Sequence, residues 1–108
     1  MATLAPQSVP LAGLSPTYAA ASAGGDAAVT GSGLVLHVKN GDAASHTVTL
    51  VTPGTEHGLA IADRAVTVAA SGSQFIPLSD DYKDPSTGLA SITYDAVTSV
   101  TVAVLRVP

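Results

Sequence analysis

The stretch of residues 89–107, LASITYDAVTSVTVAVLRV, decides the fold of this chain. In its first arm, Ala90, Ile92 and Tyr94 alternate with polar residues, which is the period of a half-buried strand. Its second arm, residues 100–107, is apolar on both faces. A strand of that kind must be covered on both sides, so we expect it in the middle of a sandwich. We interpret the two arms as a hairpin with a tight turn.

Four other short runs have the pattern of strands: residues 33–39, 46–52, 64–69 and 73–78. Asn40-Gly41-Asp42 is a turn signal, so we expect the first two runs to form an antiparallel hairpin with a longer loop. Pro77 places the last run at a sheet edge or at a strand end. No helix is expected, apart from the short one that the alanines of residues 17–23 would allow.

Six short strands separated by turn signals predict an all-β chain with one domain, a small antiparallel β-sandwich of jelly-roll or Ig-like type. We place this β-sandwich domain at residues 33–108 and an extended N-terminal arm at residues 1–32. The arm carries prolines at positions 6, 10 and 16, which disfavour helix interiors and central strands.

The N-terminal arm also carries apolar side chains at intervals, unlike a polar linker. An extended segment with such anchors docks on a surface, and two surfaces stay open at this point. The arm either packs on its own domain as an edge strand and loop, or it contacts a partner protein. The residues expected at a protein interface in the second case are Leu4, Val9, Leu11, Leu14 and Tyr18.

Composition excludes several classes of function. Only 11% of the residues are charged and the net charge is −4, so the chain has no basic patch for nucleic acid. No apolar run reaches the roughly 20 residues that span a bilayer, so no membrane partner is expected. The N-terminus lacks the pattern of a signal peptide, and we expect no export. The absence of cysteine leaves neither disulfides nor thiolate metal sites.

Two groups of residues invite a metal interpretation. Asp80, Asp81 and Asp84 cluster in a polar loop, as in calcium sites, but their spacing lacks the DxDxDG pattern and favours a solvated turn. The three histidines, His37, His46 and His57, lack HxH or HExxH spacing. Since His37 and His46 flank the turn at 40–42, we interpret them as a cross-strand surface pair.

Nothing in the sequence predicts catalysis. No GxSxG elbow is present, and the Gly-Ser-Gly of residues 31–33 precedes a strand and does not match a phosphate-binding loop. We therefore predict no catalytic, cofactor-binding or metal-binding residue, and no enzyme.

Five segments together carry a resemblance to a known family: MATLAPQSV, GLSPTYAAASAGGD, HVKNGDAASHTVTLVTPGT, GLAIAD and ITYDAVTSVTVAVLRV. They resemble small virion structural proteins of tailed bacteriophages and prophages, encoded near the major capsid protein. The resemblance implies a head decoration (cement) protein, present in the host cytoplasm during assembly and then on the capsid exterior. It also implies two partners, the major capsid protein and copies of the chain itself in a homotrimer.

Two alternatives to a decoration protein remain. One is a head–tail connector or a tail component of the same particle. The other is a non-viral adhesive or carbohydrate-binding β module, which the absence of tryptophan disfavours, because sugar sites present exposed aromatic platforms.

Overall fold

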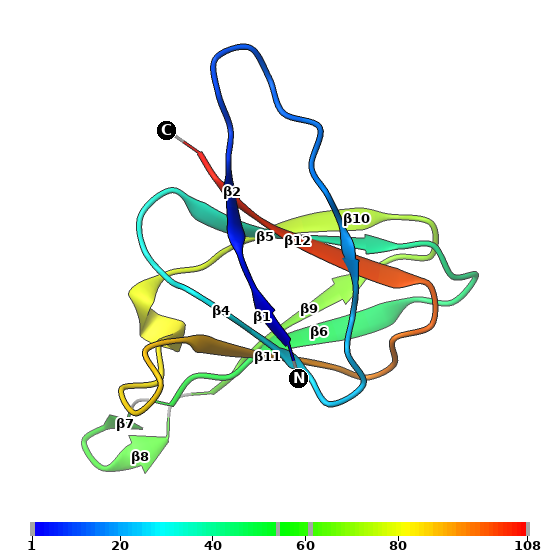
Figure 1. Ribbon diagram of the computed structural model, residues 1–108. Helices are drawn as coiled ribbons and strands as arrows, with labels where there is room; N and C mark the ends of the chain where they lie inside the picture. The colour runs from blue at the N-terminus through cyan, green and yellow to red at the C-terminus, as the bar shows by residue number, and fades with distance from the viewer. Residues whose placement is uncertain (1, 54, 61, 108) are drawn as a thin grey trace.

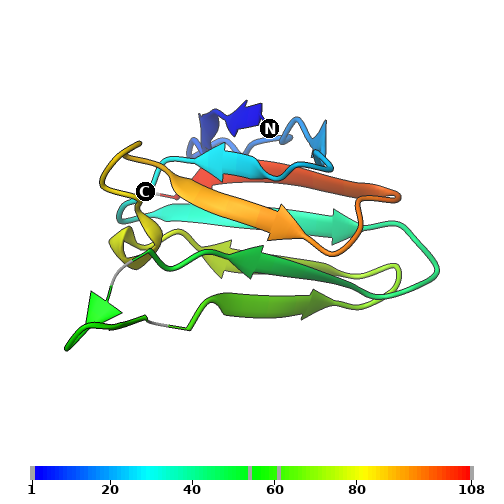
Figure 2. The same cartoon turned by 90° about the horizontal axis from the view of Figure 1, so that it is seen from below.

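The computed structural model describes residues 2–53, 55–60 and 62–107, which form a sandwich of two mixed β-sheets (Figure 1). Sheet A has the order β1-β4-β11-β6-β9, with bounds Ala2–Leu4, Asp26–Ala28, Ala90–Tyr94, His46–Leu50 and Arg64–Val68. Figure 2 shows β4, β11, β6 and β9 side by side. Sheet B has the order β10-β5-β12-β2, with bounds Ser73–Pro77, Leu34–Asn40, Val100–Arg106 and Pro6–Ser8, and β3 (Ala19–Ala20) also pairs with β12.

Two small elements complete the described structure. The strands β7 (Thr55–Glu56) and β8 (Leu59–Ala60) form a separate hairpin, and η1 (Asp80–Tyr82) is a single 3₁₀ turn. The described residues contain no α-helix, as expected, and none of their helical segments is long and apolar enough to cross a membrane. Residues 17–23 form no helix, because Ala19–Ala20 pairs as a strand with β12.

The connectivity distinguishes between the two sandwich types that the sequence allowed. From β3 onward, and apart from the separate β7–β8 hairpin, each strand lies in the sheet opposite to that of the strand before it. The one exception is the pair β6 and β9, which are neighbours in sheet A. The eight strands β3, β4, β5, β6, β9, β10, β11 and β12 are thus connected as in a jelly roll.

The expected strands are confirmed, but both expected hairpins are wrong. β11 lies in sheet A and β12 in sheet B, and β6 and β5 are separated in the same way. The reason is geometric, because two packed sheets lie about 10 Å apart, and a connection of five residues spans up to about 17 Å. A short polar connection can therefore cross the sandwich as easily as it can close a hairpin.

The central position expected for the strand at 100–107 is confirmed. β12 pairs with β5 along one side and with β2 and β3 along the other. Val102 and Val104 face the interior, while Ala103 and Leu105 on the opposite face are also buried. The edge position expected from Pro77 is confirmed too, since β10 is the first strand of sheet B. The largest fully buried apolar side chains are Leu36, Val38, Val48, Leu50, Val68, Leu78, Ile92, Val102 and Val104.

The boundary expected at residue 32 is not the boundary of the sandwich. β4 is fully buried between β1 and β11 in sheet A, and β1 and β2 pair with strands of the two sheets. The tight approach needs glycine at position 25, because a Cβ there would lie 2.6 Å from the Ile92 carbonyl oxygen. Part of the extended arm expected at residues 1–32 thus belongs to the sandwich, and its small residues allow close packing.

A buried polar contact anchors β4 to β11. Asp26 is fully buried, and its Oδ2 accepts a hydrogen bond of 2.7 Å from the Tyr94 hydroxyl and one of 3.3 Å from the Ser22 amide. Burial and then the neighbouring Asp26 carboxylate hold the pKa of the Tyr94 hydroxyl far above its ordinary value of 10.0. Tyr94 therefore acts as a donor throughout the physiological range.

We expect Val102→Asp to prevent folding, because Val102 is 1% exposed and an unpaired buried carboxylate costs several kcal/mol of a total stability of roughly 5–15 kcal/mol. Thermal unfolding followed by circular dichroism measures this. The control is Thr67→Asp, which places the same charge at an exposed position of β9 and should melt cooperatively. A Val102→Asp protein that melts at the wild-type midpoint would contradict the buried position of β12.

Tyr94 should make the free energy of unfolding decrease in alkaline solution. Its folded pKa is raised, so the unfolded chain loses this proton first, and stability is lost as the pH rises above about 10. Tyr94→Phe removes this ionisation, and we expect a smaller loss of stability in denaturant titrations between about pH 9 and 11. Tyr18→Phe is the matched control, and equal pH slopes for the two variants would contradict the assignment.

Candidate protein-contact surface

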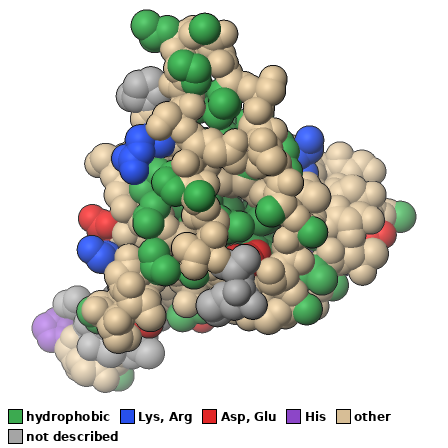
Figure 3. Space-filling model, in the orientation of Figure 1, with side chains coloured by type: hydrophobic (Ala, Val, Ile, Leu, Met, Phe, Trp, Pro, Cys, Tyr) green, Lys and Arg blue, Asp and Glu red, His purple; other side chains and the backbone are tan. Residues whose placement is uncertain are grey.

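Residues 9–18, called the arm loop below, leave the sandwich between β2 and β3 and project at the top of Figure 1. Pro10 and Gly13 form a turn, with the Gly13 amide donating to the Pro10 carbonyl at 3.0 Å and a φ of 95° that favours glycine. Leu11 is the most exposed large apolar residue described, at 104% of its reference area. Figure 3 shows hydrophobic side chains at the end of this projection. The arm loop therefore presents an apolar tip to solvent.

The base of the arm loop is closed by one side chain. The Gln7 amide nitrogen donates to the Thr17 carbonyl at 2.8 Å, and the Gln7 Oε1 accepts from the Thr17 amide at 2.9 Å. The Gln7 side-chain amide thus forms two hydrogen bonds with the Thr17 backbone, as a residue on a neighbouring strand would. At the start of the loop, the Val9 amide donates to the Arg106 carbonyl at 3.0 Å. These three bonds fix both ends of the loop on β2 and β12.

Tyr18 anchors the end of the arm loop to the outer face of sheet B. Its hydroxyl lies 2.6 Å from His37 Nδ1, and the two rings meet edge to face with centroids 5.5 Å apart. The Lys39 ammonium lies 4.6 Å from the centroid of the Tyr18 ring, a cation–π contact. Partial burial and then the nearby Lys39 charge lower the pKa of His37. His37 is therefore suited to a neutral hydrogen-bonding role.

The five residues expected at an interface occupy different environments. Leu4 is 8% exposed and belongs to the hydrophobic core, so it is removed from the set of interface residues. Tyr18 is bound to its own domain, and Val9 and Leu14 are half-buried. Only Leu11 is fully exposed among them. A truncation of residues 2–16 would remove β1 and β2 together with Leu4, and so would test folding as well as contact.

A second projection is the β7–β8 hairpin, at the lower left of Figure 1. His57 and Gly58 form its turn with positive φ angles of 54° and 79°, and Leu59 is 72% exposed. In the sequence, the connection at residues 55–63 has its two large apolar residues at Leu59 and Ile61. Leu59 is exposed in the structure, and Ile61 lies outside the described residues.

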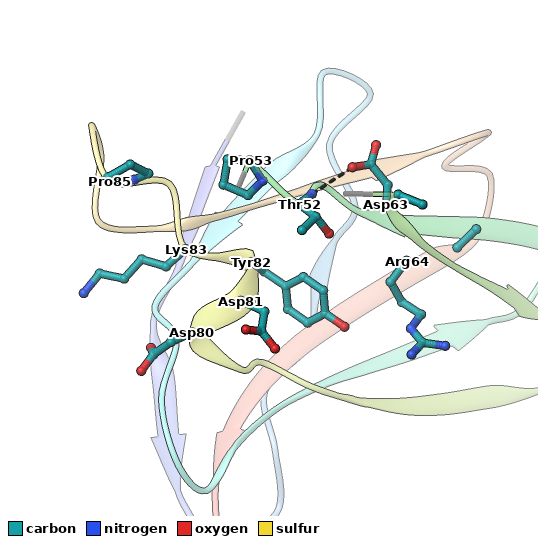
Figure 4. A pocket seen from close by; sticks show the side chains of 11 residues that line it. Thr52, Pro53, Asp63, Arg64, Asp80, Asp81, Tyr82, Lys83 and Pro85 are labelled. Carbon is teal, nitrogen blue, oxygen red and sulfur yellow. Dashed lines mark hydrogen bonds between the residues drawn. The ribbon is translucent and has the colours of Figure 1, made fainter. Parts of the chain in front are cut away.

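An open cleft of about 940 Å³ lies between η1 and the start of β9. Figure 4 shows the Tyr82 ring directed into it between Thr52 and Arg64, while the Asp80 and Lys83 side chains point away. The Asp63 carboxylate, on the rim, accepts a hydrogen bond of 2.8 Å from the Thr52 amide. Asp80 and Lys83 therefore do not converge on the cleft, and the Asp63 carboxylate is held by the backbone of Thr52.

The carboxylates of the acidic loop have separate partners. Asp80 accepts from the Thr30 hydroxyl at 2.7 Å, and Asp84 accepts from the Ser86 amide and hydroxyl at 2.9 and 2.6 Å. The Ser86 hydroxyl and amide lower the pKa of Asp84. Among the described residues, no group of three or more His, Cys, Asp or Glu side chains could hold a metal ion.

The expected surface pair of His37 and His46 is wrong, because β5 and β6 lie in different sheets. His46 is buried instead, with Nε2 at 2.8 Å from Asp42 Oδ2 and Nδ1 at 3.5 Å from Asp95 Oδ1. The hydrogen bond from His46, followed by that from the Ala43 amide, lowers the pKa of Asp42. This contact ties the loop after β5 to the loop after β11.

Comparison with protein-family models, curated proteins and solved structures finds no match to this chain. The candidate contact surface is therefore defined by its geometry alone, with the exposed Leu11 on a loop that is fixed at both ends. The hydrogen bonds of Gln7 with Thr17 and the ring contacts of His37 could not be predicted from the sequence, because both depend on pairing between distant strands. The only indication of these contacts in the sequence is the alternation of residues 33–39, which places His37 and Lys39 on one face of the strand.

Replacing Gln7 with alanine should loosen the arm loop without unfolding the sandwich, because it removes both bonds to Thr17 and no buried apolar contact. We expect amide exchange at residues 11–18 to accelerate at least several-fold, with a melting temperature within a few degrees of the wild type. Hydrogen exchange with mass spectrometry measures the effect. Gln74→Ala, at an exposed position of β10, is the control, and unchanged exchange in Gln7→Ala would contradict the clamp.

Proposed function

We propose that this chain is a virion structural protein of a tailed phage or prophage, and that it decorates the capsid by binding the major capsid protein. The observation that carries the proposal is the exposed Leu11 on a loop whose two ends are fixed by Gln7 and Tyr18. A large apolar side chain held out by a structured loop is suited to filling a pocket on another protein. The resemblance of the sequence to virion proteins supports the same conclusion.

A decoration protein needs no chemistry, because a ligand that binds only the assembled lattice stabilises it by mass action. Burial of one leucine contributes roughly 1.5–3 kcal/mol, and the contacts of many copies add across a capsid. The closed base of the arm loop lowers the conformational entropy lost on binding. The proposed location is the capsid exterior, reached from the host cytoplasm during assembly.

A head–tail connector or tail component would use the same kind of contact, and copy number separates the two. Quantitative mass spectrometry of purified particles should give hundreds of copies for a decoration protein, against about six or twelve for a ring at the portal. We expect the higher number. Absence of the chain from purified particles would overturn the proposal as a whole.

The contact itself is tested by Leu11→Ser. We expect at least a roughly tenfold weaker binding to particles that lack the wild-type protein, because about 1.4 kcal/mol corresponds to a factor of ten. Co-sedimentation of the purified variant with such particles measures the affinity. The melting temperature should stay unchanged, since Leu11 is fully exposed.

The matched control is Leu59→Ser, which removes an exposed leucine from the β7–β8 hairpin at a distance from the arm loop. Its binding should equal that of the wild type. Full binding by Leu11→Ser combined with a loss in Leu59→Ser would move the contact to the hairpin. Full binding by both variants would show that neither the arm loop nor the β7–β8 hairpin makes the contact with the particle.

A further inference from the structure

On the side of β10 that faces away from β5, no strand among the described residues pairs with its backbone groups. The Gly72 carbonyl accepts from the Asn40 amide, and the Leu78 amide donates to the Leu34 carbonyl, so both face β5. In an antiparallel ladder alternate residues face the partner strand. The intervening Ser73, Phe75 and Pro77 therefore direct their backbone groups away from the sheet. Pro77, which has no amide hydrogen, occupies an outward position, where a proline is tolerated.

Phe75 is the central residue of this strand, and its side chain is 61% exposed. Its ring stacks on His37 of the neighbouring strand, with centroids 4.0 Å apart and planes inclined by 6°. The second face of the ring therefore points away from His37, beyond the edge of the sheet. A ring on a strand added at that edge, about 4.8 Å away, would continue the stack.

The centre of this edge lacks the charges and prolines that keep edge strands apart. Ser73–Pro77 contains no charged residue, whereas β9, the corresponding edge of sheet A, begins with the exposed Arg64. Charges on an edge strand oppose edge-to-edge pairing, and a proline ends it. Pro77 stands only at the last position, so it limits the length of an added ladder and leaves its centre open.

We propose that two copies of this chain pair through their β10 strands, antiparallel and related by a two-fold axis at Phe75. In this register the two Phe75 residues exchange both backbone hydrogen bonds. The Ser73 amide of each copy faces the Pro77 carbonyl of the other. The two Phe75 rings meet on the same face, and the stack extends over four rings, from His37 of one copy to His37 of the other. A second copy fits this edge because an uncharged strand with an exposed central aromatic is complementary to itself.

The contact is isologous and closes at two copies. It therefore differs from the homotrimer that the resemblance to virion proteins implies, since a three-fold ring requires two different surfaces. The pairing does not depend on the proposed function. Binding of the chain to capsids tests the function, and the mass of the isolated protein tests the pairing.

Sedimentation equilibrium of the full chain at concentrations up to about 1 mM should give a mass approaching twice the 10.6 kDa of one chain. Phe75→Lys places like charges across the two-fold axis and should restore the monomer mass. Circular dichroism verifies its fold. A wild-type chain that stays monomeric over this range, or that forms a trimer, would overturn the proposal.

An equal mixture of Ser73→Cys and Pro77→Cys chains locates the contact and keeps Phe75, because the chain has no cysteine of its own and Ser73 of one copy faces Pro77 of the other. Paired residues in such a register have Cα atoms about 5.5 Å apart, within reach of a disulfide or a short bismaleimide linker. We expect cross-linked dimers at a yield at least several-fold above that of Thr67→Cys, an exposed position on the β9 edge. Equal yields, or a higher yield from Thr67→Cys, would show that the β10 edges do not meet.

Discussion

The two-sided burial of β12 is the constraint on which the rest of the structure depends. Val102 and Val104 face the sandwich interior, and Ala103 and Leu105 are buried on the other face. One sheet neighbour, β5, pairs along the whole length of β12, but the other side needs strands from elsewhere in the chain. The N-terminal residues supply them, in two pieces. What looks in sequence like an arm is therefore part of the fold.

The arm loop is a consequence of that arrangement. β2 runs parallel to the C-terminal half of β12, and β3 returns antiparallel along its N-terminal half. Measured along β12, the end of β2 at Arg106 and the start of β3 at Val102 are only four residues apart, or roughly 13 Å, while ten residues of the chain connect them. The residues that are not needed to span this distance must therefore leave the sheet as a loop. An apolar residue at its tip, Leu11, is thereby held in solvent by the same topology that completes the core.

Buried polar side chains fix the ends of the strands where the connections cross between sheets. The Asn40 amide nitrogen donates to the Ala44 carbonyl at 2.8 Å and to the Val68 carbonyl at 3.1 Å, so the end of β5 in sheet B is tied to the end of β9 in sheet A. The buried Asp26 joins β4 to β11 within sheet A through Tyr94, and the buried His46 closes the connection between β5 and β6 through Asp42. Leaving such a buried group unpaired costs roughly 1–3 kcal/mol, which favours one register over its alternatives.

The sequence by itself determined the six longest strands, their faces and the central place of β12, but not the short strands β1–β4, because alternation and two-sided apolar character depend on neighbouring residues alone. It also limited the candidate contact residues to a set that contains Leu11. Only the tertiary structure decided which strands pair, since connections such as residues 40–45 and 95–99 are long enough either to turn back or to cross. That choice buried Leu4, separated His37 from His46, exposed Leu11 and left Phe75 on an open edge. Each of these outcomes depends on partners distant in the chain, where local pattern carries no information.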